Sequence, residues 1–207
     1  MEREAFLAGL RQALAAAPPH AASHPPAPPP AVVPRPRWPP DSRSLSDRFG
    51  AALAAVQARL VRPAELPAAL AELEVRSAVV STDAVSLPPT IERLGPERAR
   101  AADAGVTAAV AACAATGTVV LAASPNEPRA ASLLPRVHVV AVAANTLVES
   151  PGEVLRDLHR RYPDGLPSAL TLVTGPSRSA DIGGEIVLGV HGPLAVLVVL
   201  VEQEVLP

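Results

Sequence analysis

Residues 137–143 read Val-His-Val-Val-Ala-Val-Ala, an almost wholly apolar run that predicts a β-strand covered on both of its faces. Similar short runs of small and β-branched residues occur at 78–80, 118–122, 169–173 and 194–201. Strands without a polar face are typical of a parallel or mixed sheet with helices packed on it. The chain is therefore expected to have an α/β fold, with a mixed or parallel sheet flanked by helices.

Segments with helical spacing lie before and between these runs. Residues 46–61 repeat apolar side chains every three or four positions, and Ser46 or Asp47 suits the N-cap. Residues 63–74 predict a second, short helix, since proline is tolerated in a first turn. Further helices are predicted at 89–94, 106–114 and 153–162.

Proline divides the chain into three parts. Residues 18–40 contain 11 of the 25 prolines, a density that excludes helix and sheet ladders because each ring removes an N–H donor and fixes φ. We expect this segment to be extended. The predicted organisation is an N-terminal helix over 1–17, a proline-rich linker over 18–44 and an α/β domain over 45–207.

Charge and residue types exclude several classes of function. The 18 basic and 20 acidic side chains nearly balance, which argues against a nucleic-acid-binding protein. Every basic residue is arginine, so a Schiff-base lysine and a P-loop lysine are excluded. Cys113 is the one cysteine, so the chain alone forms no internal disulfide, cysteine-based zinc site or iron–sulfur cluster. No metal and no cofactor are predicted.

The sequence favours a cytoplasmic protein without a membrane segment. Its first residues carry mixed charge, and Arg11 and Gln12 interrupt the apolar residues that follow, so an export signal is not expected. Residues 104–123 form an uncharged stretch of 20, but threonine and glycine break it. Residues 186–201 have glycine, histidine and proline in their middle. We interpret both stretches as core elements joined by turns.

The stretch Thr-Gly-Pro-Ser-Arg-Ser-Ala-Asp at 174–181 directly follows a predicted strand. In open α/β sheets, ligands bind at the carboxyl ends of strands. Gly175 permits a tight turn, and Ser177 and Arg178 supply donors suited to a carboxylate or phosphate. Asp181 is an acceptor that orients the arginine or holds a substrate hydroxyl. A capped turn, in which these side chains satisfy their own backbone, fits the same residues.

Three further segments contain candidate side chains. Gly-Val-His-Gly-Pro at 189–193 presents His191 as a hydrogen-bonding or acid–base group, or packs it in a turn. His138 is either a satisfied core residue or a ligand contact, and Thr-Gly-Thr at 116–118 either lines the same cleft or ends a helix. We expect the turns at 174–181 and 189–193 to converge on one pocket for a negatively charged ligand. The candidate ligand-binding residues are Thr116, Gly117, Thr118, His138, Gly175, Ser177, Arg178, Asp181 and His191.

Four segments, taken in order, resemble the LUD-domain family, specifically the lactate-utilisation protein C group. They are 116–118, Leu-Leu-Pro-Arg-Val-His at 133–138, 174–182 and 189–193, of which the last two are the most specific. The resemblance covers roughly residue 78 to the C-terminus. It implies a NagB/RpiA/CoA-transferase-like α/β fold and a role in bacterial oxidation of L-lactate to pyruvate. It also implies that iron–sulfur clusters belong to partner proteins, which agrees with the single cysteine.

Two positions depart from the family pattern, since Ala115 and Gly183 stand where glutamate is common. CoA-transferase chemistry needs a carboxylate nucleophile, and only Glu185 remains close in sequence to the 174–181 segment. Three functions stay open. The chain is an accessory subunit of a lactate-oxidising complex that binds a small anion, or a free-standing isomerase, transferase or ligase acting on a phosphorylated or CoA-linked substrate, or a module that recruits a partner through its N-terminal segment. We expect the first.

Overall fold

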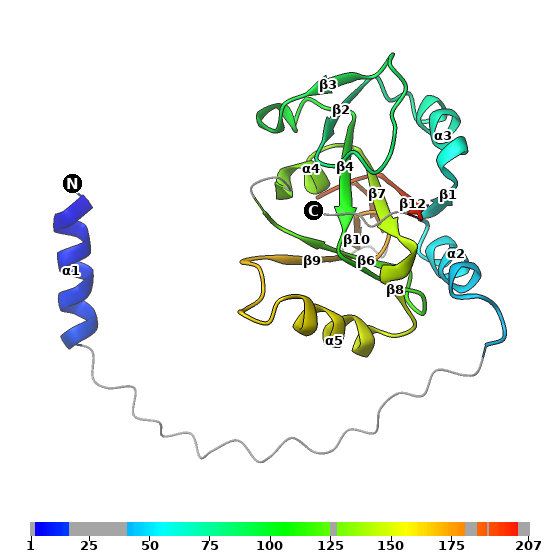
Figure 1. Ribbon diagram of the computed structural model, residues 1–207. Coiled ribbons are helices and arrows are strands. Elements are labelled where there is room, and N and C mark those ends of the chain that lie inside the picture. The colour runs from blue at the N-terminus through cyan, green and yellow to red at the C-terminus, as the bar shows by residue number, and fades with distance from the viewer. Residues whose placement is uncertain (1–2, 17–40, 125–127, 181–185, 190, 203–207) are drawn as a thin grey trace. The chain divides into compact units, whose positions relative to one another are not determined.

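The computed structural model describes residues 3–16, 41–124, 128–180, 186–189 and 191–202 (Figure 1). The chain divides into two compact units, Met1–Arg37 and Trp38–Pro207. The described part of the first unit is helix α1, Arg3–Ala16. Residues 17–40, which include most of the predicted linker, lie outside the described residues, so the division of the chain into three parts stays a prediction.

In the described part of the second unit, six parallel strands form one sheet in the order β1-β12-β7-β4-β2-β3. The strands are β1 Arg59–Val61, β2 Ser77–Val80, β3 Glu92–Leu94, β4 Ala104–Ala109, β7 Val137–Ala143 and β12 Ala195–Val201. Strands β4 and β7 are buried at every residue. The apolar run at 137–143 thus forms a central strand of the sheet, as predicted, whereas β4 beside it includes residues for which a helix was predicted.

A second sheet of four described strands, in the order β8-β5-β6-β9, packs against one face of the parallel sheet. These strands are β5 Ala111–Cys113, β6 Thr118–Ala122, β8 Leu147–Val148 and β9 Leu170–Val173. Strand β6 runs antiparallel to both β5 and β9. A separate antiparallel hairpin pairs β10, Arg178–Ala180, with β11, Ile186–Leu188.

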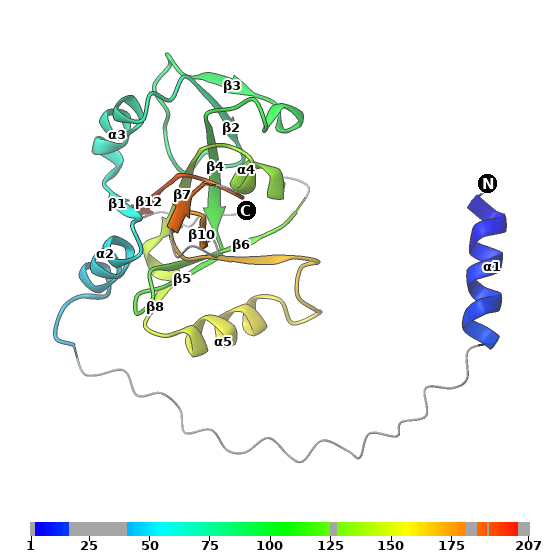
Figure 2. The same ribbon diagram turned by 180° about the vertical axis from the view of Figure 1, so that it is seen from behind.

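Helices pack on both faces of the parallel sheet and on the outer face of the second sheet (Figure 2). They are α2 Leu45–Ala55, α3 Leu66–Glu72, α4 Arg129–Leu133 and α5 Pro151–Arg161, with 3₁₀ turns at Pro63–Glu65, Pro96–Arg98 and Ala144–Thr146. Helix α3 packs on one face of the parallel sheet, and α2 packs with the second sheet on the other. Helix α5 covers the second sheet from outside. The expected α/β fold class is confirmed. Among the described helices, none has both the length and the apolar composition needed to cross a bilayer.

Two predicted helices are wrong. Residues 89–94 include strand β3, and residues 106–114 belong to strands β4 and β5. Alanine favours a helix in isolation, but the whole of 106–114 is buried between layers and pairs with neighbouring strands. Tertiary packing therefore overrides the local preference. The interpretation of 104–123 as core elements joined by turns is confirmed.

The predicted helix at 46–61 is shorter than expected. Its N-cap is Ser44, whose Oγ accepts a hydrogen bond from the Asp47 N–H at 3.1 Å. The helix ends at Ala55, because Gln57 adopts a positive φ of 63° and leads the chain into β1.

Helix α4 lies unusually close to the parallel sheet. A Cβ atom added at Gly105 in β4 would lie 1.7 Å from the backbone carbonyl oxygen of Ala131 in α4. The clash would be with backbone, which cannot rotate away, so only glycine permits this approach.

Replacing Gly105 with alanine is expected to lower the free energy of unfolding by at least about 3 kcal/mol, because helix and sheet must separate. Urea unfolding measures this loss. The control is Gly152→Ala in α5, where the added Cβ would meet only an Arg156 nitrogen at 3.7 Å and alanine is the better helix former. Equal stabilities for the two variants would contradict the close approach.

Candidate functional site

The turns around 175 and 191 lie side by side in the structure. The Ser177 N–H donates to the Pro193 carbonyl at 2.9 Å, and the Gly189 N–H donates to the Ser177 carbonyl at 2.9 Å. Together with α4 and β7 they enclose a depression of about 210 Å³. Its polar lining comprises Ser132, His138, Thr171, Thr174, Ser177 and His191. We call this cavity the motif depression.

The motif depression lies at a different edge of the fold from the one expected. Strand β9, which precedes the 174–177 turn, belongs to the second, mixed sheet and not to the parallel one. His138 and Val196, which line the depression, are the second residues of β7 and β12. The depression is therefore beside the amino ends of these parallel strands, so the argument from strand carboxyl ends does not apply to it.

His138 lines the depression with a buried imidazole. Its side chain is fully buried, and its Nε2 lies 2.8 Å from the Thr107 hydroxyl. That hydroxyl has no other partner in the described part of the chain, so we assign its hydrogen to Nε2 and the ring hydrogen to Nδ1. Burial lowers the pKa of His138 to about 4, which keeps the ring neutral at pH 7.

The Nδ1 atom of His138 is buried without a hydrogen-bond partner among the described residues. Leaving such a group unpaired costs about 1–3 kcal/mol. An acceptor that enters the depression and reaches this N–H would remove the cost. The chemistry of the lining thus suits a molecule with carboxylate or carbonyl oxygens.

Three threonine hydroxyls connect the Thr-Gly-Thr segment to the depression. The Thr116 and Thr118 Oγ1 atoms are 2.7 Å apart, and the Thr118 and Thr174 Oγ1 atoms are 2.8 Å apart. The segment is the turn of the β5–β6 hairpin and not the end of a helix, which corrects the prediction. Thr116 and Thr118 therefore reach the depression through Thr174 rather than by lining it.

Both site glycines allow turns to pack on the C-terminal end of α2. Gly117 has a φ of 64°, and a Cβ there would lie 2.8 Å from backbone atoms of Ala52 and Leu53. Gly175 has a φ of 82°, and a Cβ there would lie 2.3 Å from the Val56 carbonyl oxygen. Positive φ and close backbone contact both require glycine. These residues shape the site and present no side chain to a ligand.

Arg178 does not line the motif depression. Its guanidinium donates to the carbonyl oxygen of Val56, the C-cap of α2, where a positive charge also suits the helix dipole. The described lining has hydroxyls and imidazoles but neither an arginine nor a carboxylate. Asp181, the predicted acceptor, lies outside the described residues.

Some polar contacts of the site could not be predicted. Thr107 becomes a partner of His138 only through the pairing of β4 with β7, in which Gly105 lies opposite His138.

Cys113 is buried, and its sulfur contacts the Glu149 carbonyl oxygen at 3.7 Å. Within the described ranges, no group of three or more His, Cys, Asp or Glu side chains could hold a metal ion.

Comparison with known proteins gives a consistent picture. The LUD domain model matches residues 71–201. Proteins named lactate utilization protein C are 41% identical in Halalkalibacterium halodurans, 38% in Shouchella clausii and 39% in Bacillus licheniformis, each over 109 residues. These matches cover 52% of this chain and 47%, 48% and 45% of the relatives, so the chain spans about half of their length.

A crystal structure of a DUF162 family protein from Deinococcus radiodurans has the same fold. It superposes with a TM-score of 0.55 at 24% identity, covering 75% of this chain and 95% of that one.

The buried His138 predicts a pH dependence of stability. Its pKa is about 4 in the folded protein against the ordinary histidine value of 6.5, so the unfolded chain binds more protons between these values. The free energy of unfolding therefore falls as the pH is lowered through this window. Between pH 7 and pH 5 the expected loss is about 2 kcal/mol.

Urea unfolding at the two pH values measures the loss. His138→Gln, which removes the titrating ring, should lose correspondingly less than the wild type, whereas His159→Gln on the exposed face of α5 should behave like the wild type. The same loss in the wild type and in His138→Gln would contradict the assignment.

Proposed function

The chain belongs to the LUD domain family, and on that premise we propose that it serves bacterial lactate utilisation by binding a small organic anion in the motif depression. The relatives are named lactate utilization protein C, which supports the role in lactate utilisation. The Nδ1 atom of His138, buried and unpaired among the described residues, carries the ligand class, since with the ring hydrogen assigned to it this atom calls for an oxygen acceptor.

A short hydroxy or oxo acid fits the size and polarity of the depression. Its volume of about 210 Å³ has room for roughly seven water-sized groups at about 30 Å³ each. The carboxylate accepts from His138 and Ser177, and the neighbouring hydroxyl or carbonyl oxygen faces Thr174. His191, exposed at the rim, completes the contacts. L-lactate and pyruvate both have this pattern of oxygens.

Gly175 and Arg178 act as positioning residues in this proposal. Both hold the 174–177 turn against the Val56 carbonyl at the end of α2. This turn places the Ser177 N–H beside the Pro193 carbonyl oxygen. The arginine thus sets the shape of the binding site through α2 rather than by touching the ligand.

The redox step in this proposal belongs to iron–sulfur partner proteins in the cytoplasm. The chain has one cysteine, Cys113, which is buried in the second sheet and cannot ligate a cluster alone. The chain then acts as the accessory component that binds the acid.

Titration of the full chain with L-lactate and pyruvate tests ligand binding. His138→Gln can keep the contact with the Thr107 hydroxyl, because its amide oxygen accepts in place of Nε2, but it removes the Nδ1 donor and should weaken binding about tenfold or more. Calorimetry measures the dissociation constants. Ser168→Ala, an exposed residue outside the lining, is the control and should bind like the wild type. Equal affinity for lactamide, or no effect of His138→Gln, would overturn the proposed ligand class.

Growth of the source bacterium tests the process independently. Deleting the gene is expected to prevent growth on L-lactate as sole carbon source but not on glucose. The wild-type and Ser168→Ala genes should restore growth, and the His138→Gln gene should not. Undiminished growth of the deletion strain on L-lactate would contradict the proposed role in lactate utilisation.

A further inference from the structure

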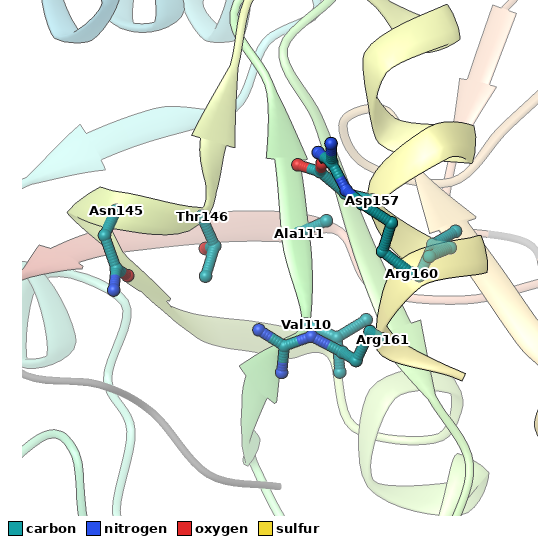
Figure 3. Close-up of a pocket in the computed structure, with 8 residues that line it drawn as sticks. Val110, Ala111, Asn145, Thr146, Asp157, Arg160 and Arg161 are labelled. Carbon is teal, nitrogen blue, oxygen red and sulfur yellow. The ribbon is translucent and has the colours of Figure 1, made fainter. Parts of the chain in front are cut away.

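A second cavity, of about 330 Å³, lies at the carboxyl ends of β4 and β7 (Figure 3). Val110 and Ala111 follow β4, and Asn145 and Thr146 follow β7. The remaining lining residues are Asp157, Leu158, Arg160 and Arg161 from the last turns of α5. We call this cavity the α5 pocket.

The position of the α5 pocket is one that open α/β sheets use for ligands. β4 and β7 are neighbours in the parallel sheet and pair over six positions, so their carboxyl ends open side by side. The chain leaves both strands there for the second sheet, where β5 and β8 pair in parallel, and the last turns of α5 line the space beside this junction. The motif depression, by contrast, lies near the amino ends of the parallel strands. The two cavities are therefore separate.

Arg161 gives the α5 pocket a positive charge that is unpaired among the described residues. Arg160 forms an ion pair with Asp157, whereas Arg161 has no ion pair or hydrogen bond among the described residues. Figure 3 shows the Arg161 side chain extending from the end of α5 toward the side of the pocket formed by Asn145 and Thr146. With two arginines and one aspartate, the lining carries one net positive charge.

The rest of the lining divides into apolar and polar parts. Val110, Ala111 and Leu158 are each at most 3% exposed and present apolar surface. The Thr146 hydroxyl donates to the Ala143 carbonyl at 2.8 Å, so its lone pairs remain available to accept. The Asn145 side chain is exposed and offers both a donor and an acceptor.

We propose that the α5 pocket binds the monoanion of a small carboxylic acid. The planar guanidinium of Arg161 holds the carboxylate through two parallel N–H···O bonds. The carbon chain lies on Val110 and Leu158, and a polar substituent meets Asn145 or Thr146. A single net positive charge matches one carboxylate, whereas a phosphate dianion or a nucleotide would leave negative charge uncompensated. This site goes beyond the function proposed above and does not depend on it.

The charge at Arg161 is more than a helix-end effect. A basic residue in the last turn stabilises a helix without any cavity, and Arg160 already supplies such charge. Arg161 differs because it lines a cavity with an apolar wall and has no partner among the described side chains. That combination of features is typical of a small-molecule site.

An NMR titration of the full chain with butyrate tests the proposal. Butyrate should shift the backbone amides of residues 110–111, 145–146 and 157–161, and butyramide, its neutral analogue, should bind about tenfold or more weakly. Arg161→Gln should weaken butyrate binding by a similar factor at an unchanged melting temperature, because the side chain is exposed. The matched control is Arg156→Gln on the same helix, outside the pocket, and it should bind like the wild type.

Three results would overturn the proposal. Butyramide binding as tightly as butyrate would show that the charge is not recognised. Unchanged butyrate affinity in Arg161→Gln would show that Arg161 does not bind the carboxylate. Shifts confined to residues 171–177 and 191–193 would place the anion in the motif depression instead.

Discussion

Close approach between layers governs this fold, because its core is made of alanine, valine and leucine with few larger side chains. Strands β4 and β7 are buried at every residue, and at Gly105 the backbone of α4 lies where a Cβ would otherwise stand. A core packed in this way leaves little room between its layers. The motif depression and the α5 pocket accordingly lie at the ends of the central strands, where turns replace regular pairing.

Strands and helices were predictable where a single local pattern dominates. The unbroken apolar run of β7 and the amphipathic spacing of α5 each agree with the environment found in the structure. The alanine-rich residues 106–114 could not be assigned in this way. Alanine prefers a helix by a few tenths of a kcal/mol per residue or more, whereas pairing with strands distant in sequence is absent from any local window. Such long-range pairing decides β4 and β5.

The turns of the motif depression were predictable from glycine and proline, but the contacts across them were not. Ser177 meets Pro193 because two turns are brought together by strands in different sheets. Arg178 donates to Val56, 122 residues away in the chain, so an expectation based on its own segment assigns the guanidinium to a ligand. Glycine spacing predicts where a chain turns, whereas the direction of a long side chain depends on the element packed beside it.

The hydrogen bonds among the hydroxyls of Thr116, Thr118 and Thr174 can run in either of two directions. Each hydroxyl both donates and accepts, so all the O···O contacts survive if every hydrogen rotates to the opposite neighbour. In one arrangement Thr174 points a proton outward, and in the other it shows only electron pairs. The Thr174 hydroxyl at the rim therefore changes from donor to acceptor by rotation of the hydroxyl hydrogens alone, without movement of any heavy atom. Thr174 could therefore accept a hydrogen bond from an alcohol and donate one to the ketone formed from that alcohol.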